Sequence, residues 1–172
     1  MTSSAELPAE EHPIDLSVVI ATFNRAPDLA ATLGSLSGIK TRPTQTEPTQ
    51  TGPIQTGPAR HSGRTWELIV VDNNCTDNTR AIVERFAARF PVPLRYVFEK
   101  RQGRSPALNA GIAASSGDII VTTDDDVRVE ADWLDRIADA LNRLDCDYVG
   151  GRVLPIWEAP RPAWLPDHGG KH

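Results

Sequence analysis

The segment Gly117–Asp126 places three consecutive carboxylates directly after a short run of β-branched apolar residues. The apolar part, Ile119-Ile120-Val121, is typical of a strand buried in a parallel sheet, because helices cover both faces of such a strand. Two carboxylates about 4 Å apart repel by roughly 1 kcal/mol in water and by about 4 kcal/mol at an effective dielectric near 20. Three of them at the end of a buried strand therefore lower stability unless a cation neutralises them.

The triplet Asp124, Asp125 and Asp126 has two interpretations. In extended backbone alternate side chains share a face, which predicts that Asp124 and Asp126 project together while Asp125 points away. Such a pair offers oxygen ligands to a hard divalent cation that also holds substrate phosphates. The alternative is a solvated acidic turn before a helix that starts near Glu130. The position of the triplet favours a site, because open α/β sheets bind ligands at the carboxyl ends of their strands.

Apolar strand patterns and amphipathic helix patterns alternate along the whole chain. The expected strands are 16–21, 66–71, 94–98, 119–121 and 147–154, and the expected helices are 27–37, 79–89, 106–114 and one through Trp133 and Leu141. This alternation with short connections is typical of βαβ units. It predicts an α/β fold, a Rossmann-like βαβ sandwich with a mostly parallel sheet.

The length of 172 residues allows one hydrophobic core. We expect residues 1–14 to be a disordered leader, residues 15–157 to be the folded domain, and residues 158–172 to be a C-terminal tail. Within residues 40–64 a unit that begins Pro-Thr-Gln-Thr recurs nearly three times. Because these prolines remove amide donors and no apolar periodicity is present, we expect a disordered insertion there.

Composition excludes several classes of function. The net charge of −5 gives no support for nucleic-acid binding. No segment has the length of a membrane span, and the N-terminus lacks the pattern of a signal peptide, so a cytoplasmic location is expected, with peripheral membrane association left open. Cys75 and Cys146 have no metal-ligand spacing and are expected to be reduced bystanders.

Polar residues also follow the first two expected strands. They are Ala21-Thr22-Phe23-Asn24-Arg25 and Asp72-Asn73-Asn74. If the sheet is parallel, both groups meet the acidic triplet at one edge. There Phe23 would pack against a base and Asp72 would accept hydrogen bonds from a base or ribose, which suits a nucleoside diphosphate bound through a metal. Taken singly, each group is better explained as a strand end or a turn; together they favour a site.

The segment Lys100–Gly111 is basic and opens a helix whose free amide groups attract anions. Its Arg104 is a candidate contact for a diphosphate or a base. The segment matches neither a Walker A loop nor a dinucleotide glycine pattern. The alternative, that these residues are only exposed surface cations before a helix, has equal weight. A nucleotidyltransferase would need a glycine-rich loop after the first strand, and residues 22–25 contain no glycine.

Four segments, in the order Val18–Arg25, Glu67–Thr79, Gly103–Ile112 and Gly117–Val127, resemble the family-2 glycosyltransferases with the GT-A fold of nucleotide-diphospho-sugar transferases. The resemblance covers residues from about 16 to 157 apart from the insertion. It implies an inverting, hexosyltransferase-like enzyme that moves a sugar from a nucleotide diphosphate donor, often a UDP-sugar, to an acceptor hydroxyl with Mg²⁺ or Mn²⁺. The acceptor would be a carbohydrate or a lipid-linked molecule.

The resemblance also implies roles for residues at matching positions. Thr22 and Phe23 would line the nucleobase pocket, and Asp72 would hold the base. The metal ligands would be Asp124 and Asp126, with Asp124 facing the ribose or the metal. The full set of expected donor-binding residues is Thr22, Phe23, Asn24, Arg25, Asp72, Asn74, Arg104, Asn109, Asp124 and Asp125.

Two departures from the family pattern affect these expectations. Many relatives have Ala-Arg-Asn where this chain has Ala107-Leu108-Asn109, so Arg104 or Arg101 must substitute if a cation is needed there. Inversion also requires a general base for the acceptor hydroxyl, which the family takes from a later segment; Glu158 and Asp167 are the only late acids, and neither lies in a convincing motif. We therefore expect that this chain contains only the donor-binding half of such an enzyme. The alternative function is a nucleotide-sugar-binding remnant without turnover.

Overall fold

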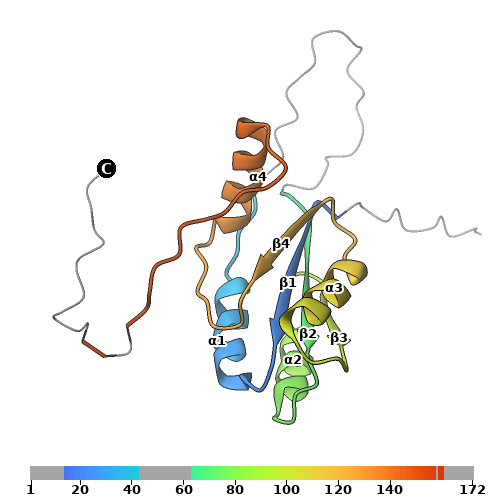
Figure 1. Ribbon diagram of the computed structural model, residues 1–172. Coiled ribbons are helices and arrows are strands. Elements are labelled where there is room, and N and C mark those ends of the chain that lie inside the picture. The colour runs from blue at the N-terminus through green and yellow to red at the C-terminus, as the bar shows by residue number, and fades with distance from the viewer. Residues whose placement is uncertain (1–13, 43–62, 158, 161–172) are drawn as a thin grey trace, which may run out of the picture.

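The computed structural model describes residues 14–42, 63–157 and 159–160. It contains one sheet of four parallel strands in the order β3-β2-β1-β4. The strands are β1 (Leu16–Thr22), β2 (Trp66–Asp72), β3 (Leu94–Phe98) and β4 (Ile119–Thr123), and the helices are α1 (Ala26–Leu36), α2 (Thr79–Ala87), α3 (Arg104–Ala114) and α4 (Trp133–Leu144) (Figure 1). The predicted α/β fold with a parallel sheet is confirmed.

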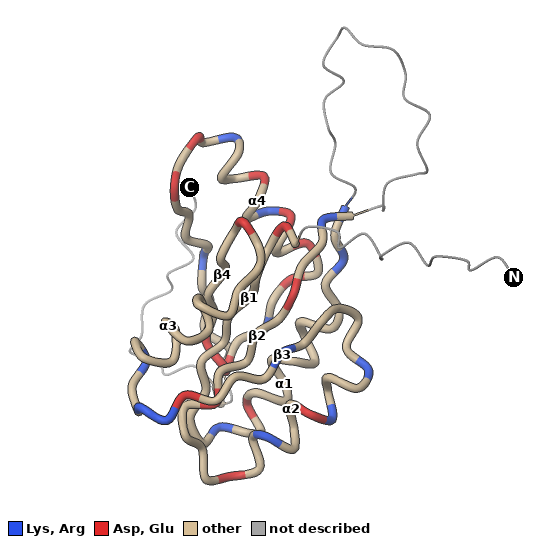
Figure 2. Tube along the Cα trace, turned by 90° about the vertical axis from the view of Figure 1, so that its right-hand side faces the viewer, with Lys and Arg blue, Asp and Glu red and all other residues tan. Residues whose placement is uncertain are grey.

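Helices cover both faces of the sheet, which explains the nearly continuous apolar sequence of its central strands. On one face Val18, Ile20 and Leu68 pack with α1, α2 and the start of α4. On the other face Val19 and Ile69 pack against α3. As a result every residue of β2 is buried. Loops that carry many of the charged residues follow the strands at the bottom of Figure 2.

The predicted strand 147–154 is wrong. Helix α4 ends at Leu144. The next residue, Asp145, has a left-handed conformation with φ of 47°, and the described residues beyond it contain no strand. Tyr148 and Val153 are each 86% exposed. A strand-like composition indicates only that a segment fits a pleated, half-buried surface, and within the described part of the chain this segment has no strand partner. The described residues also contain no helix with the length and apolar composition needed to cross a bilayer.

The predicted leader, insertion and tail lie mainly outside the described residues, but the flanks of the insertion are visible. Asp135 on α4 is fully buried and accepts hydrogen bonds from the backbone N–H of Arg42 (2.8 Å), from Arg42 Nε (3.1 Å) and from Arg64 Nη1 (2.9 Å). Burial raises the pKa of Asp135, but these hydrogen bonds outweigh it and hold the pKa below its usual range. The flanks are thus fixed to α4, away from the carboxyl ends of the strands.

Helix α3 lies very close to the sheet at Gly111. A Cβ atom at this position would overlap Cγ1 of Val19 and lie 2.9 Å from Cγ2 of Val71. Ala107, one turn earlier, is fully buried against the same face. This contact between small residues and the sheet fixes the first turn of α3, and therefore Arg104, beside the carboxyl ends of the strands.

We expect Gly111→Ala to lower the free energy of unfolding by about 1–2 kcal/mol, because overpacking against two stiff valines outweighs alanine's better helix propensity. The matched control is Gly34→Ala on α1, where a Cβ has nothing within 4 Å. That substitution should raise stability by about 0.5–1 kcal/mol. Urea denaturation measures both, and a stabilised Gly111→Ala protein would show that α3 is not held by this contact.

Candidate functional site

A pocket of about 430 Å³ lies at the carboxyl ends of β1 and β4, beside the start of α3. Its volume is in the range of small-ligand sites. The predicted site residues that line it are Thr22, Phe23, Arg25, Arg104, Asp124 and Asp125. Those that do not are Asn24, Asp72, Asn74, Asn109 and Asp126.

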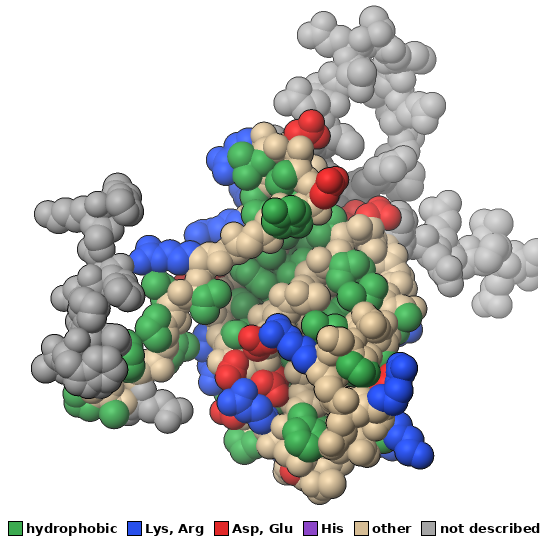
Figure 3. Space-filling view, in the orientation of Figure 1, with side chains coloured by type: hydrophobic (Ala, Val, Ile, Leu, Met, Phe, Trp, Pro, Cys, Tyr) green, Lys and Arg blue, Asp and Glu red, His purple; other side chains and the backbone are tan. Residues whose placement is uncertain are grey.

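A larger groove of about 980 Å³ lies between β4 and α4. It is formed by the unpaired edge of β4 and the segment 145–151, and neither arginine nor lysine lines it within the described residues. Figure 3 shows this groove with an apolar floor, and below it the smaller pocket's corner with interleaved acidic and basic side chains. The charged groups suited to a phosphorylated ligand therefore gather at the smaller pocket.

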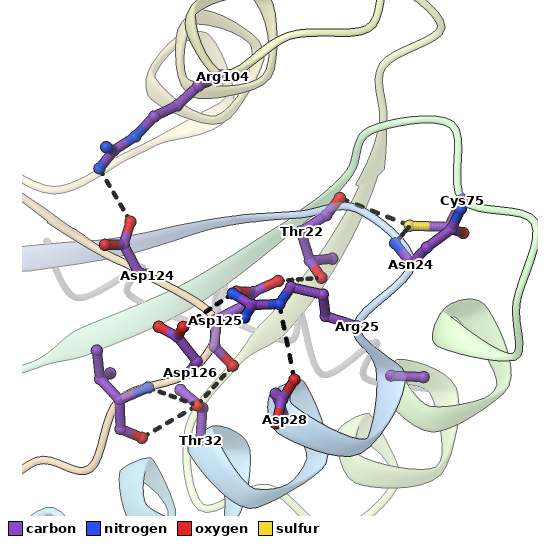
Figure 4. A network of polar contacts seen from close by, with 12 residues as sticks. Thr22, Asn24, Arg25, Asp28, Thr32, Cys75, Arg104, Asp124, Asp125 and Asp126 are labelled. Carbon is purple, nitrogen blue, oxygen red and sulfur yellow. Dashed lines mark hydrogen bonds and ion pairs between the residues drawn. The ribbon is translucent and has the colours of Figure 1, made fainter. Parts of the chain in front are cut away.

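Asp125 fastens the acidic turn to the rest of the fold. Its side chain is only 7% exposed. Thr22 Oγ1 donates a hydrogen bond to Asp125 Oδ2 (2.6 Å), and Arg25 Nη1 donates one to Oδ1 (3.2 Å) (Figure 4). The hydroxyl of Thr32 on α1 also donates to the Asp125 backbone carbonyl (2.8 Å). Together these bonds hold the end of β4 beside the end of β1.

Asp124 and Asp126 are exposed (59% and 44% of each side chain), and each pairs with a different arginine. Arg104 Nη2 lies 2.9 Å from Asp124 Oδ1, and Arg25 Nη1 lies 2.8 Å from Asp126 Oδ2. The predicted arrangement, with Asp124 and Asp126 on one face and Asp125 turned away, is wrong. The strand ends before the triplet and the chain turns there, so the alternation of extended backbone does not continue.

The repulsion expected among the three carboxylates is offset by two guanidinium groups, which leave these five side chains with a net charge of −1. The hydrogen bond to Asp126, followed by the negative charges of Asp125 and Asp126, raises the pKa of Arg25. Arg25 therefore stays charged at any physiological pH. The sequence predicted that a cation would neutralise the carboxylates; in the structure Arg25 and Arg104 supply this positive charge.

The carboxylate oxygens at this corner are suitable ligands for a divalent cation that binds together with phosphates. Within the described residues, no three His, Cys, Asp or Glu side chains converge as a ready metal centre. Magnesium, however, is commonly bound by one or two carboxylates together with substrate phosphates. Asp124 and Asp126 are exposed carboxylates of this kind.

Asp72 lies at the end of β2 and is only 3% exposed. Its Oδ2 accepts a hydrogen bond from the Tyr96 hydroxyl (2.7 Å), and its Oδ1 accepts one from the backbone N–H of Cys75 (2.7 Å). Burial, and then this hydrogen bond, raise the pKa of Tyr96, which keeps its hydroxyl protonated as a donor. These contacts orient Asp72, and each carboxylate oxygen retains a second lone pair, but its side chain does not line the pocket.

Besides Asp72, three asparagines predicted as donor contacts do not line the pocket. Asn24 has a φ of 53° and Asn74 a φ of 65°, the left-handed conformation that asparagine tolerates better than most residues. Asn24 Oδ1 accepts a hydrogen bond from the Thr76 backbone N–H (2.7 Å), which joins the loop after β1 to the loop after β2. Asn109 is exposed on α3. The contacts of Asn24 are those of a residue that shapes the loops.

The structure brings Asn73, which the sequence prediction omitted, into the pocket lining. Its Nδ2 donates to the carbonyls of Glu99 (3.2 Å) and Arg101 (2.7 Å), and its Oδ1 accepts from the Gly103 N–H (2.7 Å). Asn73 therefore holds the loop before α3, where Gly103 has a φ of 129° that favours glycine. The Asp-Asn-Asn turn was visible in the sequence, but nothing in it distinguished the three side chains.

We expect Asn73→Ala to release the loop at residues 99–103, because it removes all three of these hydrogen bonds. Asn73→Asp is the matched variant, since it retains the acceptor for Gly103 and loses both donors. Amide hydrogen exchange at Gly103 should be fast in Asn73→Ala and stay protected in Asn73→Asp. Equal protection in wild type and Asn73→Ala would mean that the loop is held by other contacts.

Comparison with known proteins places this geometry in a family. The model of "Glycosyl transferase family 2" matches residues 17–169. Succinoglycan biosynthesis protein ExoM of Rhizobium meliloti is 30% identical over 159 residues, which are 92% of this chain and 44% of that protein. Glycosyltransferase AglE of Haloferax volcanii is 28% identical over 138 residues, 80% of this chain and 39% of that protein. The chain thus spans about two fifths of the length of these relatives.

Solved structures share the fold. Mannosyltransferase PcManGT from Pyrobaculum calidifontis, in complex with GDP-Man and Mn²⁺, superposes with a TM-score of 0.58 at 25% identity over 79% of this chain and 36% of that one. TarS of S. aureus in complex with UDP-GlcNAc superposes with a TM-score of 0.57 at 20% identity, over 83% of this chain and 37% of that one. The predicted GT-A fold is confirmed, and with a family model that matches most of its length, the chain belongs to glycosyl transferase family 2.

Proposed function

We propose that this chain is the donor-binding part of an inverting glycosyltransferase, which holds a nucleotide-diphospho-sugar at the carboxyl edge of its sheet. UDP is the expected nucleotide, and the acceptor hydroxyl belongs to a carbohydrate or a lipid-linked sugar. The observation that carries this proposal is the convergence of Arg25, Arg104 and the acidic turn on one pocket at that edge. Relatives that bind GDP-Man with Mn²⁺ and UDP-GlcNAc support it.

The two sides of the pocket suit the two parts of such a donor. Phe23, 46% exposed, offers an apolar face to the nucleobase. Asp72, which is buried at the end of the neighbouring strand and outside the pocket lining, is the expected acceptor for hydrogen bonds from the base. On the other side, the first turn of α3 has no side-chain cap, so its amide groups and Arg104 are suited to the diphosphate.

Asp124 and Asp126 are the residues we assign to Mn²⁺ or Mg²⁺. When bound, the cation would neutralise charge on the departing nucleotide. The chain's own residues position the donor: Asp125 fixes the turn that carries both ligands, and Thr22 fixes Asp125. A cytoplasmic location, with or without peripheral attachment to a membrane, fits a nucleotide-sugar donor and stays part of this proposal.

One observation favours the second candidate function, a nucleotide-sugar-binding unit that does not transfer. General base catalysis contributes about 10²–10⁴-fold to rate. Within the described residues, the only acids that line the pocket are Asp124 and Asp125, and both are paired with arginines. Donor hydrolysis separates the two functions, because a binding unit would bind UDP and leave the UDP-sugar intact.

We expect Asp126→Asn to weaken Mn²⁺-dependent UDP binding by about tenfold or more, because it removes a ligand charge from the cation. The matched control is Asp132→Asn, an aspartate of similar exposure (48%) that pairs with Arg136 on α4; it should bind as wild type does. Calorimetry with UDP, and with GDP in parallel, measures both variants with and without Mn²⁺. Undiminished affinity in Asp126→Asn would refute its role, and no binding of either nucleotide by wild type would refute both candidate functions.

A further inference from the structure

We propose that Arg25 is an internal counterion that occupies the acidic turn when no donor is bound, so that the divalent cation and the diphosphate must bind together. This inference rests on the proposed function and adds a coupling between two ligands of the same site. It gives Arg25 a positioning role that differs from the plain donor contact expected from the sequence.

The position of the Arg25 guanidinium is the first support. One nitrogen, Nη1, lies between two carboxylates, 3.2 Å from Asp125 Oδ1 and 2.8 Å from Asp126 Oδ2. A cation held by Asp126 would lie beside this guanidinium, which carries a like charge. Arg25 and the metal therefore compete for one place, and the metal binds only when Arg25 moves away.

The charge balance gives the direction of the coupling. The four carboxylates of Asp28, Asp124, Asp125 and Asp126 and the two guanidinium groups leave a net charge of −2 at this corner. A divalent cation alone would only cancel this charge, whereas a diphosphate bound with the cation brings further negative charge. Attraction between phosphate oxygens and the released guanidinium also favours the joint complex. Binding of either ligand should therefore strengthen binding of the other by the same factor.

The surroundings of Arg25 allow it to leave. Its side chain is 49% exposed, and its Nε lies 3.6 Å from Asp28 Oδ2 in the first turn of α1, which offers another partner. After its departure, the Thr22 hydroxyl still holds Asp125 Oδ2 at 2.6 Å, and the bound cation replaces the positive charge of Arg25 beside the buried carboxylate. Arg104 is more exposed (69%) and pairs with the exposed Asp124, whereas Arg25 bridges the buried Asp125 and the exposed Asp126.

The test is a titration with Mn²⁺ in which free Mn²⁺ is followed by electron paramagnetic resonance, without nucleotide and with UDP. Arg25→Gln should bind Mn²⁺ alone about tenfold more tightly than wild type, a factor typical of coupling between sites. The matched control is Arg136→Gln, which removes the same charge from an ion pair on α4; its Mn²⁺ affinity should equal that of wild type. UDP should increase Mn²⁺ affinity more in wild type than in Arg25→Gln.

Unchanged or weaker Mn²⁺ binding by folded Arg25→Gln would overturn the inference. If wild type binds UDP with Mn²⁺ in that case, only the coupling fails; if wild type binds no nucleotide, the proposed function fails. Should Arg25→Gln not fold, the Nε–Hε resonance of Arg25, assigned by its loss in Arg25→Lys, gives the answer in wild type. It should shift when Mg²⁺ and UDP are added together and stay in place with Mg²⁺ alone; a resonance unmoved by both together overturns the inference.

Discussion

The buried carboxylate of Asp125 is the interaction on which the candidate site depends. An unpaired charge in this position would be strongly destabilising, and the Thr22 hydroxyl and the Arg25 guanidinium satisfy it from the end of β1 and the loop that follows. The bond from Thr32 on α1 fixes the same turn through its backbone. This anchoring leaves the flanking carboxylates at the surface, where they can meet a ligand.

The other side of the pocket depends on close packing. Gly111 lets α3 approach Val19 and Val71, and this approach brings the first turn of the helix to the carboxyl edge of the sheet. Asn73 then holds the loop that leads into the helix. Core packing therefore also determines the geometry of the site, because the residues that set the distance between α3 and the sheet also set the distance between Arg104 and the acidic turn.

The fold was predictable because its signal is local. Apolar runs such as 66–71 indicate buried strands whatever their partners, and parallel strands bring their ends together, so the region of the site followed as well. The detailed contacts did not follow. Which carboxylate is buried depends on where β4 ends. The left-handed conformation turns Asn24 toward the next loop, while Asn73 lines the pocket and holds the loop before α3. The segment 147–154 carries a strand pattern, but no described strand pairs with it.

The proposed site requires a cation and a nucleotide to bind together at the carboxyl edge of the sheet. Paramagnetic broadening of amide resonances by Mn²⁺ in the presence of UDP locates the ion, because the effect falls steeply with distance from it. Resonances of residues 22–25 and 123–126 should broaden, while those of Asp15 and Gly117, at the amino ends of β1 and β4, should stay sharp. Uniform broadening, or broadening centred on α4, would contradict the proposed site.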